Sequence, residues 1–197
     1  MVRKSTDIRQ EEIKSAVLSI IFREGLKNVS TKNIAKEVGI SEGSIFRHFN
    51  SKKDIILAIM EDVSNDLIES LRKISLSDKP APTRLFDYLC KTVTYLVTYK
   101  GITMLLFSEA SYQNDTQMIT KLNYIFNSQK QLAGKIVSDG IANGIWDETV
   151  SVENFSSLYM GIPLSLNIEM LLNRENFEHK NFCRKNYMLI LKILEKK

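Results

Sequence analysis

Residues 30–54 read STKNIAKEVGISEGSIFRHFNSKKD, and no other stretch of the chain says as much about its fold. Ser30 suits the N-cap position of a helix. The buried side of that helix is formed by three apolar residues at helical spacing: Ile34, Ala35 and Val38. Gly39 fits the turn that follows, because glycine adopts a positive φ at little cost. The stretch therefore predicts a short helix, a tight turn and a second short helix.

The helix after the turn is expected to start at Ser41 as its cap and to bury Ile45 and Phe49. Ile40 and Ile45 are placed as a hydrophobic staple, which sets the angle at which the chain enters the helix. Ser51 and Asp54 then form a capping box for another helix.

The outer side of the helix after the turn carries residues suited to DNA. A recognition helix contacts base edges mainly through its N-terminal residues. Small residues there let the backbone approach closely, and Arg47 can donate two hydrogen bonds to guanine or one to phosphate. His48 can donate to a phosphate. The exposed residues are expected to be Ser41, Glu42, Gly43, Ser44, Arg47 and His48.

Lys52 and Lys53 stand at the start of the next helix, where a positive charge opposes the helix dipole. A docked phosphate reverses that effect, because the dipole and the free N–H groups both attract an anion. The alternative is that exposed lysines simply tolerate a small penalty. The net charge supports a polyanion partner, since residues 1–55 hold 11 Lys/Arg against 7 Asp/Glu and the rest holds 16 of each.

Helical periodicity continues along the chain. A first helix is expected over 8–24, ending at Gly25, and the helix capped by Ser51 should reach about residue 73. The proline-containing segment 75–83 separates it from further helices at 83–99, 102–111, 115–142, 151–173 and 176–195. Gly161 and Pro163 should kink the fourth of these. The prediction is an all-α fold of about nine helices.

Cys90 and Cys183 are too few for a disulfide framework, so free buried thiols in a reducing cytosol are expected. His179 and Cys183 lie four residues apart, but two ligands do not close a zinc site, and no metal site is predicted. No cofactor is expected either. The N-terminus lacks the apolar core of a signal peptide, and no run matches a membrane span. A soluble, cytoplasmic protein that does not contact membranes is predicted.

The stretch 30–54 resembles the tetracycline-repressor (TetR) family of transcription regulators. The resemblance is carried by Ser30 to Ala35, Val38 to Ser41, Gly43 to Phe49 and Ser51 to Ile55, and by the preceding helix with Gly25. It covers about residues 8–60. Beyond them, only the helical character and the length fit the family.

The resemblance implies a helix-turn-helix DNA-binding domain at 1–54 and a ligand-binding and dimerisation domain at 55–197. It implies a homodimer that binds double-stranded DNA at a palindromic operator and is released by a small effector. Ser30, Thr31, Lys32 and Lys52 would meet phosphates, and Ser41, Gly43, Ser44, Arg47 and His48 would read bases. Position 46 is often Tyr in the family, whose hydroxyl bonds a phosphate. Phe46 retains only apolar contact with DNA.

The C-terminal domain is then expected to enclose a largely hydrophobic ligand. The candidate contacts are Met104, Phe107, Glu109, Tyr112, Met118, Leu122, Phe126, Phe155 and Tyr159. The helix at 151–173 is apolar on several sides, so a second subunit would bury its extra side; a larger monomeric core is the alternative. The candidate dimer contacts are Leu158, Ile162, Leu166, Phe182, Leu189, Ile190 and Ile193.

Two other classes of function were weighed. An enzyme has little support, because the sequence lacks a phosphate loop, a dinucleotide fingerprint, a metal triad and a nucleophile elbow. A helical adaptor that binds only protein remains possible on fold alone. The predicted function is a DNA-binding transcriptional regulator, acting as a repressor that a ligand releases, and not an enzyme.

Overall fold

The computed structural model describes residues 5–112, 115–172 and 179–196, without the side chains of 107, 109–112, 179 and 180. Over these residues the chain forms helices and no strand. It divides into two compact units. Unit 1 comprises Met1–Asp62 and Tyr99–Leu122, and unit 2 comprises Val63–Thr98 and Asn123–Lys197.

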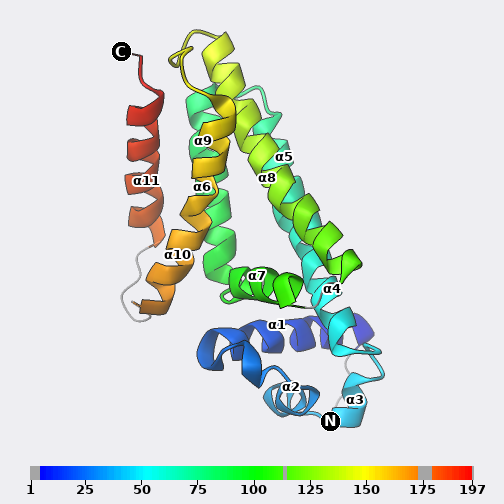
Figure 1. Cartoon of the computed structure of the whole chain (residues 1–197). Coiled ribbons are helices and arrows are strands. Elements are labelled where there is room, and N and C mark those ends of the chain that lie inside the picture. Colours follow the sequence, from blue (N-terminus) through cyan, green and yellow to red (C-terminus); the bar gives the residue numbers. More distant parts are fainter. Residues whose placement is uncertain (1–4, 113–114, 173–178, 197) are drawn as a thin grey trace. The chain divides into compact units, whose positions relative to one another are not determined.

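Unit 1 holds the predicted helix-turn-helix. Its elements are α1 (Thr6–Glu24), η1 (Leu26–Asn28), α2 (Thr31–Val38), α3 (Glu42–Ile45), α4 (Lys52–Asp62), α7 (Ile102–Tyr112) and the start of α8 (Thr116–Ala142). α1 packs against α2, α4 and α7 (Figure 1). The apolar face predicted for the first helix is buried as expected: Ile13, Ala16, Val17, Ile20 and Ile21.

Local signals end and begin the helices of unit 1 where the sequence predicts. Gly25 ends α1 at φ 85°, and Gly39 ends α2 in the left-handed region at φ 73°. The Ser30 hydroxyl accepts a hydrogen bond from the Asn33 amide at 3.2 Å. The Ser51 hydroxyl accepts one from the Asp54 amide at 3.1 Å. These caps satisfy amides that the first turn of a helix leaves without a partner.

Unit 2 contains the remaining helices. They are the π-helical η2 (Val63–Ile68), α5 (Glu69–Ser75), α6 (Ala81–Thr98), the rest of α8, α9 (Val152–Tyr159), α10 (Gly161–Leu172) and α11 (His179–Leu194). α4, η2 and α5 follow one another without a break. α9 and α10 are interrupted only at Met160, next to the predicted kink. Counted as continuous helices, the described elements give the nine that were predicted.

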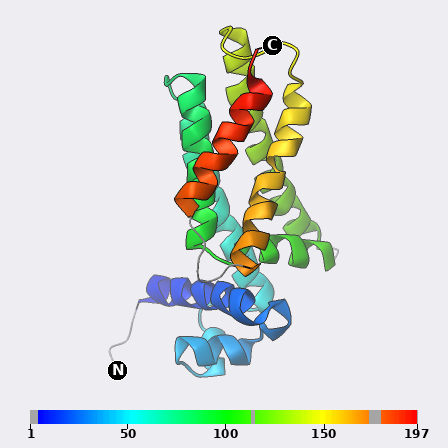
Figure 2. The same ribbon diagram turned by 90° about the vertical axis from the view of Figure 1, so that its left-hand side faces the viewer.

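In unit 2, α5, α10 and α11 pack against α6, and Figure 2 shows α11 beside it. A buried arginine joins α6 to two neighbours. Arg84 donates from Nη1 to the Ser75 carbonyl at 2.7 Å and to Asp139 Oδ2 at 2.9 Å. Burial acts to raise the pKa of Asp139, but hydrogen bonds from Lys135 and Arg84 outweigh it and lower that pKa. The pair therefore keeps both charges and fastens α8 to α6.

The end of α8 approaches Trp146 closely enough to require a glycine. A Cβ built on Gly140 would lie 2.1 Å from Trp146 Cε3, and the indole is buried. Two carbon atoms that are not bonded to each other cannot lie that close, and a packed indole cannot move aside freely. Gly140 therefore lets the turn after α8 fold back onto its own helix.

The prediction of free thiols is wrong. Cys90 on α6 and Cys183 on α11 form a disulfide, with their Cα atoms 5.6 Å apart and 93 residues between them in sequence. The described residues include no free cysteine. Spacing in the sequence cannot show such a pair, because it depends on how α11 returns to α6. Cys183 is also no longer a candidate metal ligand.

One stretch, Val152–Leu172, is long and apolar enough for a membrane span by length and composition, with a mean hydropathy of 1.2. In the structure 39% of that window is buried inside the protein. A helix from a soluble core passes the same test, so this one stretch is weak evidence for a membrane partner.

Candidate nucleic-acid interface

The turn between α2 and α3 is closed by backbone hydrogen bonds. The Ile40 amide donates to the Ala35 carbonyl at 2.9 Å, and the Gly39 amide donates to the Lys36 carbonyl at 3.3 Å. This pattern satisfies the last carbonyls of α2 and requires the positive φ of Gly39. The chain therefore leaves α2 in one defined direction and places α3 beside it.

α3 is shorter than predicted. Its α-helical part is limited to Glu42–Ile45, and a turn covers the next three residues. Ser41 stands at the N-cap position, but its hydroxyl does not cap the helix and instead lies 2.7 Å from the Ser44 hydroxyl. The amides of His48 and Phe49 still donate to the Ile45 carbonyl, at 2.9 and 3.0 Å. Ile45 and Phe49 are buried as predicted, so the outer side keeps its orientation.

The structure brings the predicted DNA-binding residues together on α2, α3 and the start of α4. Phe46 is 52% exposed, although it is a large apolar side chain. The other exposed members are Ser30, Lys32, Ser41, Gly43 and Arg47, and the half-buried members are Thr31, Ser44, His48 and Lys52. We call these ten residues, together with Glu42, the α2–α3 surface.

Two members of the α2–α3 surface have contacts that the sequence did not reveal. The Thr31 hydroxyl donates to the Glu42 carboxylate, which ties the first turn of α2 to the first turn of α3. His48 has a buried Nδ1 with no hydrogen-bond partner in the protein, while its carbonyl accepts from Gln10 Nε2 at 3.0 Å. One face of His48 is therefore turned into the protein.

Lys53, the second of the two lysines at the start of α4, has a partner within unit 1. Lys53 forms an ion pair with Asp115, whose carboxylate also accepts from the Gln117 and Met118 amides at the start of α8. The Lys53 hydrogen bond is the main cause of a lowered pKa for Asp115. The positive charge of Lys53 opposes the helix dipole, but it has an ion-pair partner, Asp115, within the protein. Lys52, which is predicted to contact phosphate, is half-buried in the first turn of α4.

Glu42 was predicted to be exposed, but it was not among the predicted DNA-binding residues. It is the first residue of α3 and lies beside Gly43 at the exposed end of the helix. A carboxylate in that place can accept from the N4 amino group of cytosine. Its position at the tip of a recognition helix was the signal that could have identified it.

The candidate ligand contacts are divided between the two compact units. Met104, Met118 and Leu122 belong to unit 1, and Phe126, Phe155 and Tyr159 to unit 2. The side chains of Phe107, Glu109 and Tyr112 lie outside the described residues.

Within unit 2, the rings of Phe155 and Tyr159 lie 6.1 Å apart, and Tyr159 is 5.9 Å from Tyr88, which the sequence analysis missed. Phe126 is 38% exposed. Burial raises the pKa of Tyr159, so its phenol stays neutral.

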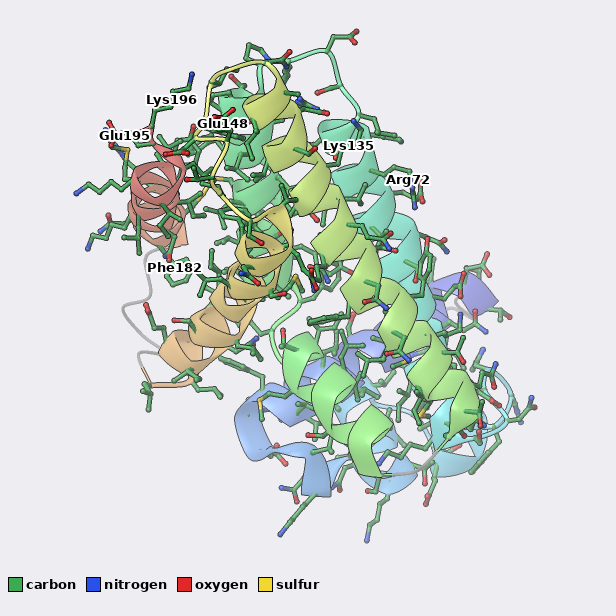
Figure 3. All side chains as sticks on the ribbon, turned by 45° about the horizontal axis from the view of Figure 1, so that its top comes forward. Arg72, Lys135, Glu148, Phe182, Glu195 and Lys196 are labelled. Atoms are coloured by element: carbon green, nitrogen blue, oxygen red, sulfur yellow. A yellow bond between two sulfur atoms is a disulfide. The ribbon has the colours of Figure 1, made fainter. Side chains whose placement is uncertain are left out.

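The candidate dimer contacts divide by exposure. Leu166, Phe182 and Ile190 are buried within unit 2, and Ile162 is half-buried. Figure 3 shows Phe182 on the first turns of α11. The apolar residues left exposed on α9, α10 and α11 are Leu158, Leu164, Ile168, Leu172, Met188, Leu189 and Ile193. We call these seven residues the α9–α11 strip.

Comparison with known proteins finds a family model that matches the first helices of the chain. Residues 15–59 match the family model of bacterial regulatory proteins, tetR family. The nucleoid occlusion factor SlmA of Actinobacillus pleuropneumoniae is 24% identical over 128 residues, which span 64% of this chain and 63% of that protein. The chain thus matches less than two thirds of the length of this relative.

Solved structures share the fold. FadR from Bacillus subtilis, a transcriptional regulator in complex with stearoyl-CoA, superposes with a TM-score of 0.73 at 18% identity, covering 94% of this chain and 99% of that one. The ketosteroid transcriptional regulator of Mycobacterium tuberculosis gives 0.79 at 15% identity and covers 96% of each chain. Residues 15–59, which run from α1 into α4, thus match the tetR family model, and the chain shares its fold with solved transcriptional regulators.

Proposed function

We propose that the protein is a homodimeric repressor that binds a palindromic operator and is released by a small, largely hydrophobic effector. The observation that carries this proposal is the α2–α3 surface. It combines an exposed Arg47, an exposed Lys32 and small residues at the tip of α3, all on or directly after the packed helices α2 and α3 of unit 1. A regulator of this kind works in the cytoplasm, where the chromosome is.

Base reading and phosphate binding predict different effects of mutation. Arg47→Ala should cost about 1–3 kcal/mol and relax the preference at one base position. Lys32→Ala should weaken binding to all sequences and reduce the salt slope by about 1. Lys196→Ala removes an exposed lysine from unit 2 and serves as the matched control.

These effects are measured on fragments selected from a genomic pool, by fluorescence anisotropy at several salt concentrations. An Arg47→Ala protein with the parent's sequence preference would remove Arg47 from the reading surface. Failure of the parent protein to select any fragment would remove the DNA-binding proposal.

A homodimer is supported by the α9–α11 strip. Its seven apolar side chains range from Leu164 at 43% exposed to Leu172 at 77%. Several large apolar side chains left exposed on the helices of one unit often mark an interface. In a homodimer, a two-fold axis would bring the same residues of both copies to one interface and remove their apolar surface from water.

The dimer proposal is tested by placing a charge in the strip. Leu189 is 59% exposed on α11, and Leu189→Glu should shift the protein to monomer. Leu76, at 57% exposed after α5, lies outside the strip, so Leu76→Glu is the matched control. Light scattering after size exclusion measures both. A Leu189→Glu protein that stays dimeric at low concentration contradicts this interface.

A hydrophobic effector is supported by the aromatic side chains of unit 2 and by the molecules named for two similar structures, stearoyl-CoA and a ketosteroid. Stearoyl-CoA is the first probe to test, with free coenzyme A as the control that lacks the acyl chain. Release of the operator by the acyl compound alone is expected. Equal release by coenzyme A would show that the polar part is what the protein recognises.

A further inference from the structure

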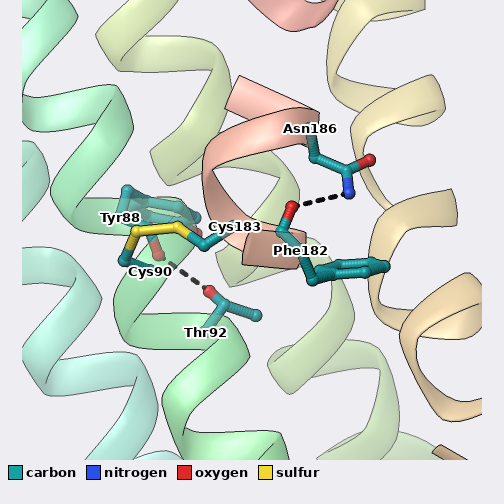
Figure 4. The surroundings of a disulfide bond; sticks show 6 residues. All are labelled: Tyr88, Cys90, Thr92, Phe182, Cys183 and Asn186. Atoms are coloured by element: carbon teal, nitrogen blue, oxygen red, sulfur yellow. Dashed lines mark hydrogen bonds between the residues drawn. A yellow bond between two sulfur atoms is a disulfide. The ribbon is translucent and has the colours of Figure 1, made fainter. Parts of the chain in front are cut away.

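A disulfide joins α6 to α11 (Figure 4), and its two cysteines differ in how far they are exposed to solvent. Cys183 is 3% exposed, whereas Cys90 is half-buried. Cys90 is therefore the member of the pair that a thiolate in solution approaches more easily. Access to one sulfur is sufficient for thiol–disulfide exchange.

α11 has few other polar ties to unit 2 among the described contacts. The Tyr187 hydroxyl donates to the Pro82 carbonyl at 2.9 Å, and its ring meets Phe86 edge-on at 5.0 Å. Near the end of the helix, the Asp147 amide donates to the Leu194 carbonyl at 3.0 Å. All three contacts are on the C-terminal side of Cys183. The disulfide is thus the covalent hold on the first turns of α11.

α11 also carries part of the α9–α11 strip. Met188 is 51% exposed, Leu189 59% and Ile193 44%, while Ile190 and Leu194 face the core of unit 2. The seating of α11 on α6 therefore sets where these exposed side chains stand relative to α10. A change at the sulfur pair alters the surface proposed to form the dimer.

A disulfide that serves only to stabilise the fold is unusual in the cytosol. Disulfides in the cytosol of most organisms are transient and serve catalysis or redox sensing. A DNA-binding regulator works in that compartment. A cytosolic disulfide that seats an interface helix is therefore suited to report the thiol–disulfide balance.

We propose that Cys90–Cys183 is a redox-active pair, and that its reduction by a cellular dithiol loosens α11 and weakens the homodimer and, with it, operator binding. The exchange chemistry stands on the disulfide alone; the effect on dimer and DNA rests on the function proposed above.

The exchange proceeds in two balanced steps. A thiolate of the dithiol attacks Cys90 Sγ, the S–S bond breaks, and its electron pair leaves on Cys183 Sγ, which takes up a proton. The second thiol of the reductant loses its proton and attacks the mixed disulfide. Cys90 leaves and is protonated, and the reductant ends as a disulfide. The reverse exchange with an oxidised dithiol closes the bond again.

The test compares oxidised and reduced forms of the full chain without mutation. Dithiothreitol is titrated under native conditions, and free thiols are counted by alkylation with a polyethylene-glycol maleimide. Dimer dissociation is measured by sedimentation and operator affinity by anisotropy in the same samples. Reduction is expected to weaken dimerisation by about tenfold or more, within the usual range of coupling between sites. Reoxidation should restore it.

The control is the double variant Cys90→Ser/Cys183→Ser, which should behave like the reduced protein and ignore dithiothreitol. Cys90→Ser alone is the second variant if the double variant misfolds. A bond that resists reduction in the folded protein overturns the proposal, as do unchanged dimerisation after full reduction and a chain that is monomeric in both forms. If dimerisation responds but neither form binds DNA, the operator function fails and the redox pair stands.

Discussion

Phe46 offers a gain-of-function test of the α2–α3 surface. It lies in the turn after α3, directly before Arg47, and 52% of it is exposed. The substitution Phe46→Tyr adds one hydroxyl at the ring edge. Because the side chain is already exposed, the new hydroxyl does not have to be buried in the free protein, and the folded state should tolerate it.

The expected gain follows from one added hydrogen bond to a phosphate oxygen. A typical net contribution is about 0.5–1.5 kcal/mol, which corresponds to roughly twofold to tenfold tighter binding. The hydroxyl is neutral, so the number of counterions released on binding should not change. The dissociation constant should therefore fall while the salt slope stays the same.

Fluorescence anisotropy with a labelled operator fragment, repeated at several salt concentrations, measures both quantities. Phe86→Tyr adds the same hydroxyl to a phenylalanine that is 38% exposed in unit 2, and should leave operator affinity unchanged. If Phe46→Tyr folds normally but binds no tighter than the parent, position 46 does not face a phosphate. The placement of the turn after α3 against DNA would then have to be revised.

Two further predictions concern the stability of unit 2. Gly140→Ala should cost about 1–3 kcal/mol by overpacking, because its Cβ would lie 2.1 Å from Trp146; Gly161→Ala has no atom within 4 Å of its new Cβ and should be nearly neutral in urea unfolding. Asp139→Ala should cost about 1–3 kcal/mol, because it leaves the buried Arg84 without its carboxylate and Asp139 itself is only partly buried. The pKa of Asp139 is lowered from 3.8, so its contribution should be complete above that pH and disappear as the pH falls through the lowered value; a cost that is the same at low pH would contradict the ion pair.

The helix-turn-helix could be predicted in detail because its signals are local. A hydroxyl cap acts on an amide three residues away, as Ser30 and Ser51 do, and a glycine in the left-handed region ends the helix that precedes it. The burial of Ile45 and Phe49 followed from the same short spacing. The length of α3 was the exception, because the Ser41 hydroxyl bonds Ser44 and does not cap the helix.

The division at residue 54 is a functional prediction, and packing divides the chain differently. Unit 1 continues through α4 to Asp62 and also takes in Tyr99–Leu122. α7 meets the first helix there: Gly101 adopts φ 89°, and a Cβ on it would lie 2.7 Å from the Leu18 carbonyl. No periodicity within residues 99–122 indicates that α1 is their neighbour.

The sequence alone determined most of the helical elements, the Ser30 and Ser51 caps and the exposed residues of α2 and α3 that are proposed to contact DNA, because each of these depends on residues within a few positions of one another. The tertiary structure decided which long-range partners meet: Cys90 with Cys183, Lys53 with Asp115, and Thr31 with Glu42. It also decided which apolar side chains of α10 and α11 are buried and which form the α9–α11 strip. A helix that is apolar on several sides does not specify which side packs inward, and only the neighbouring helices settle that choice.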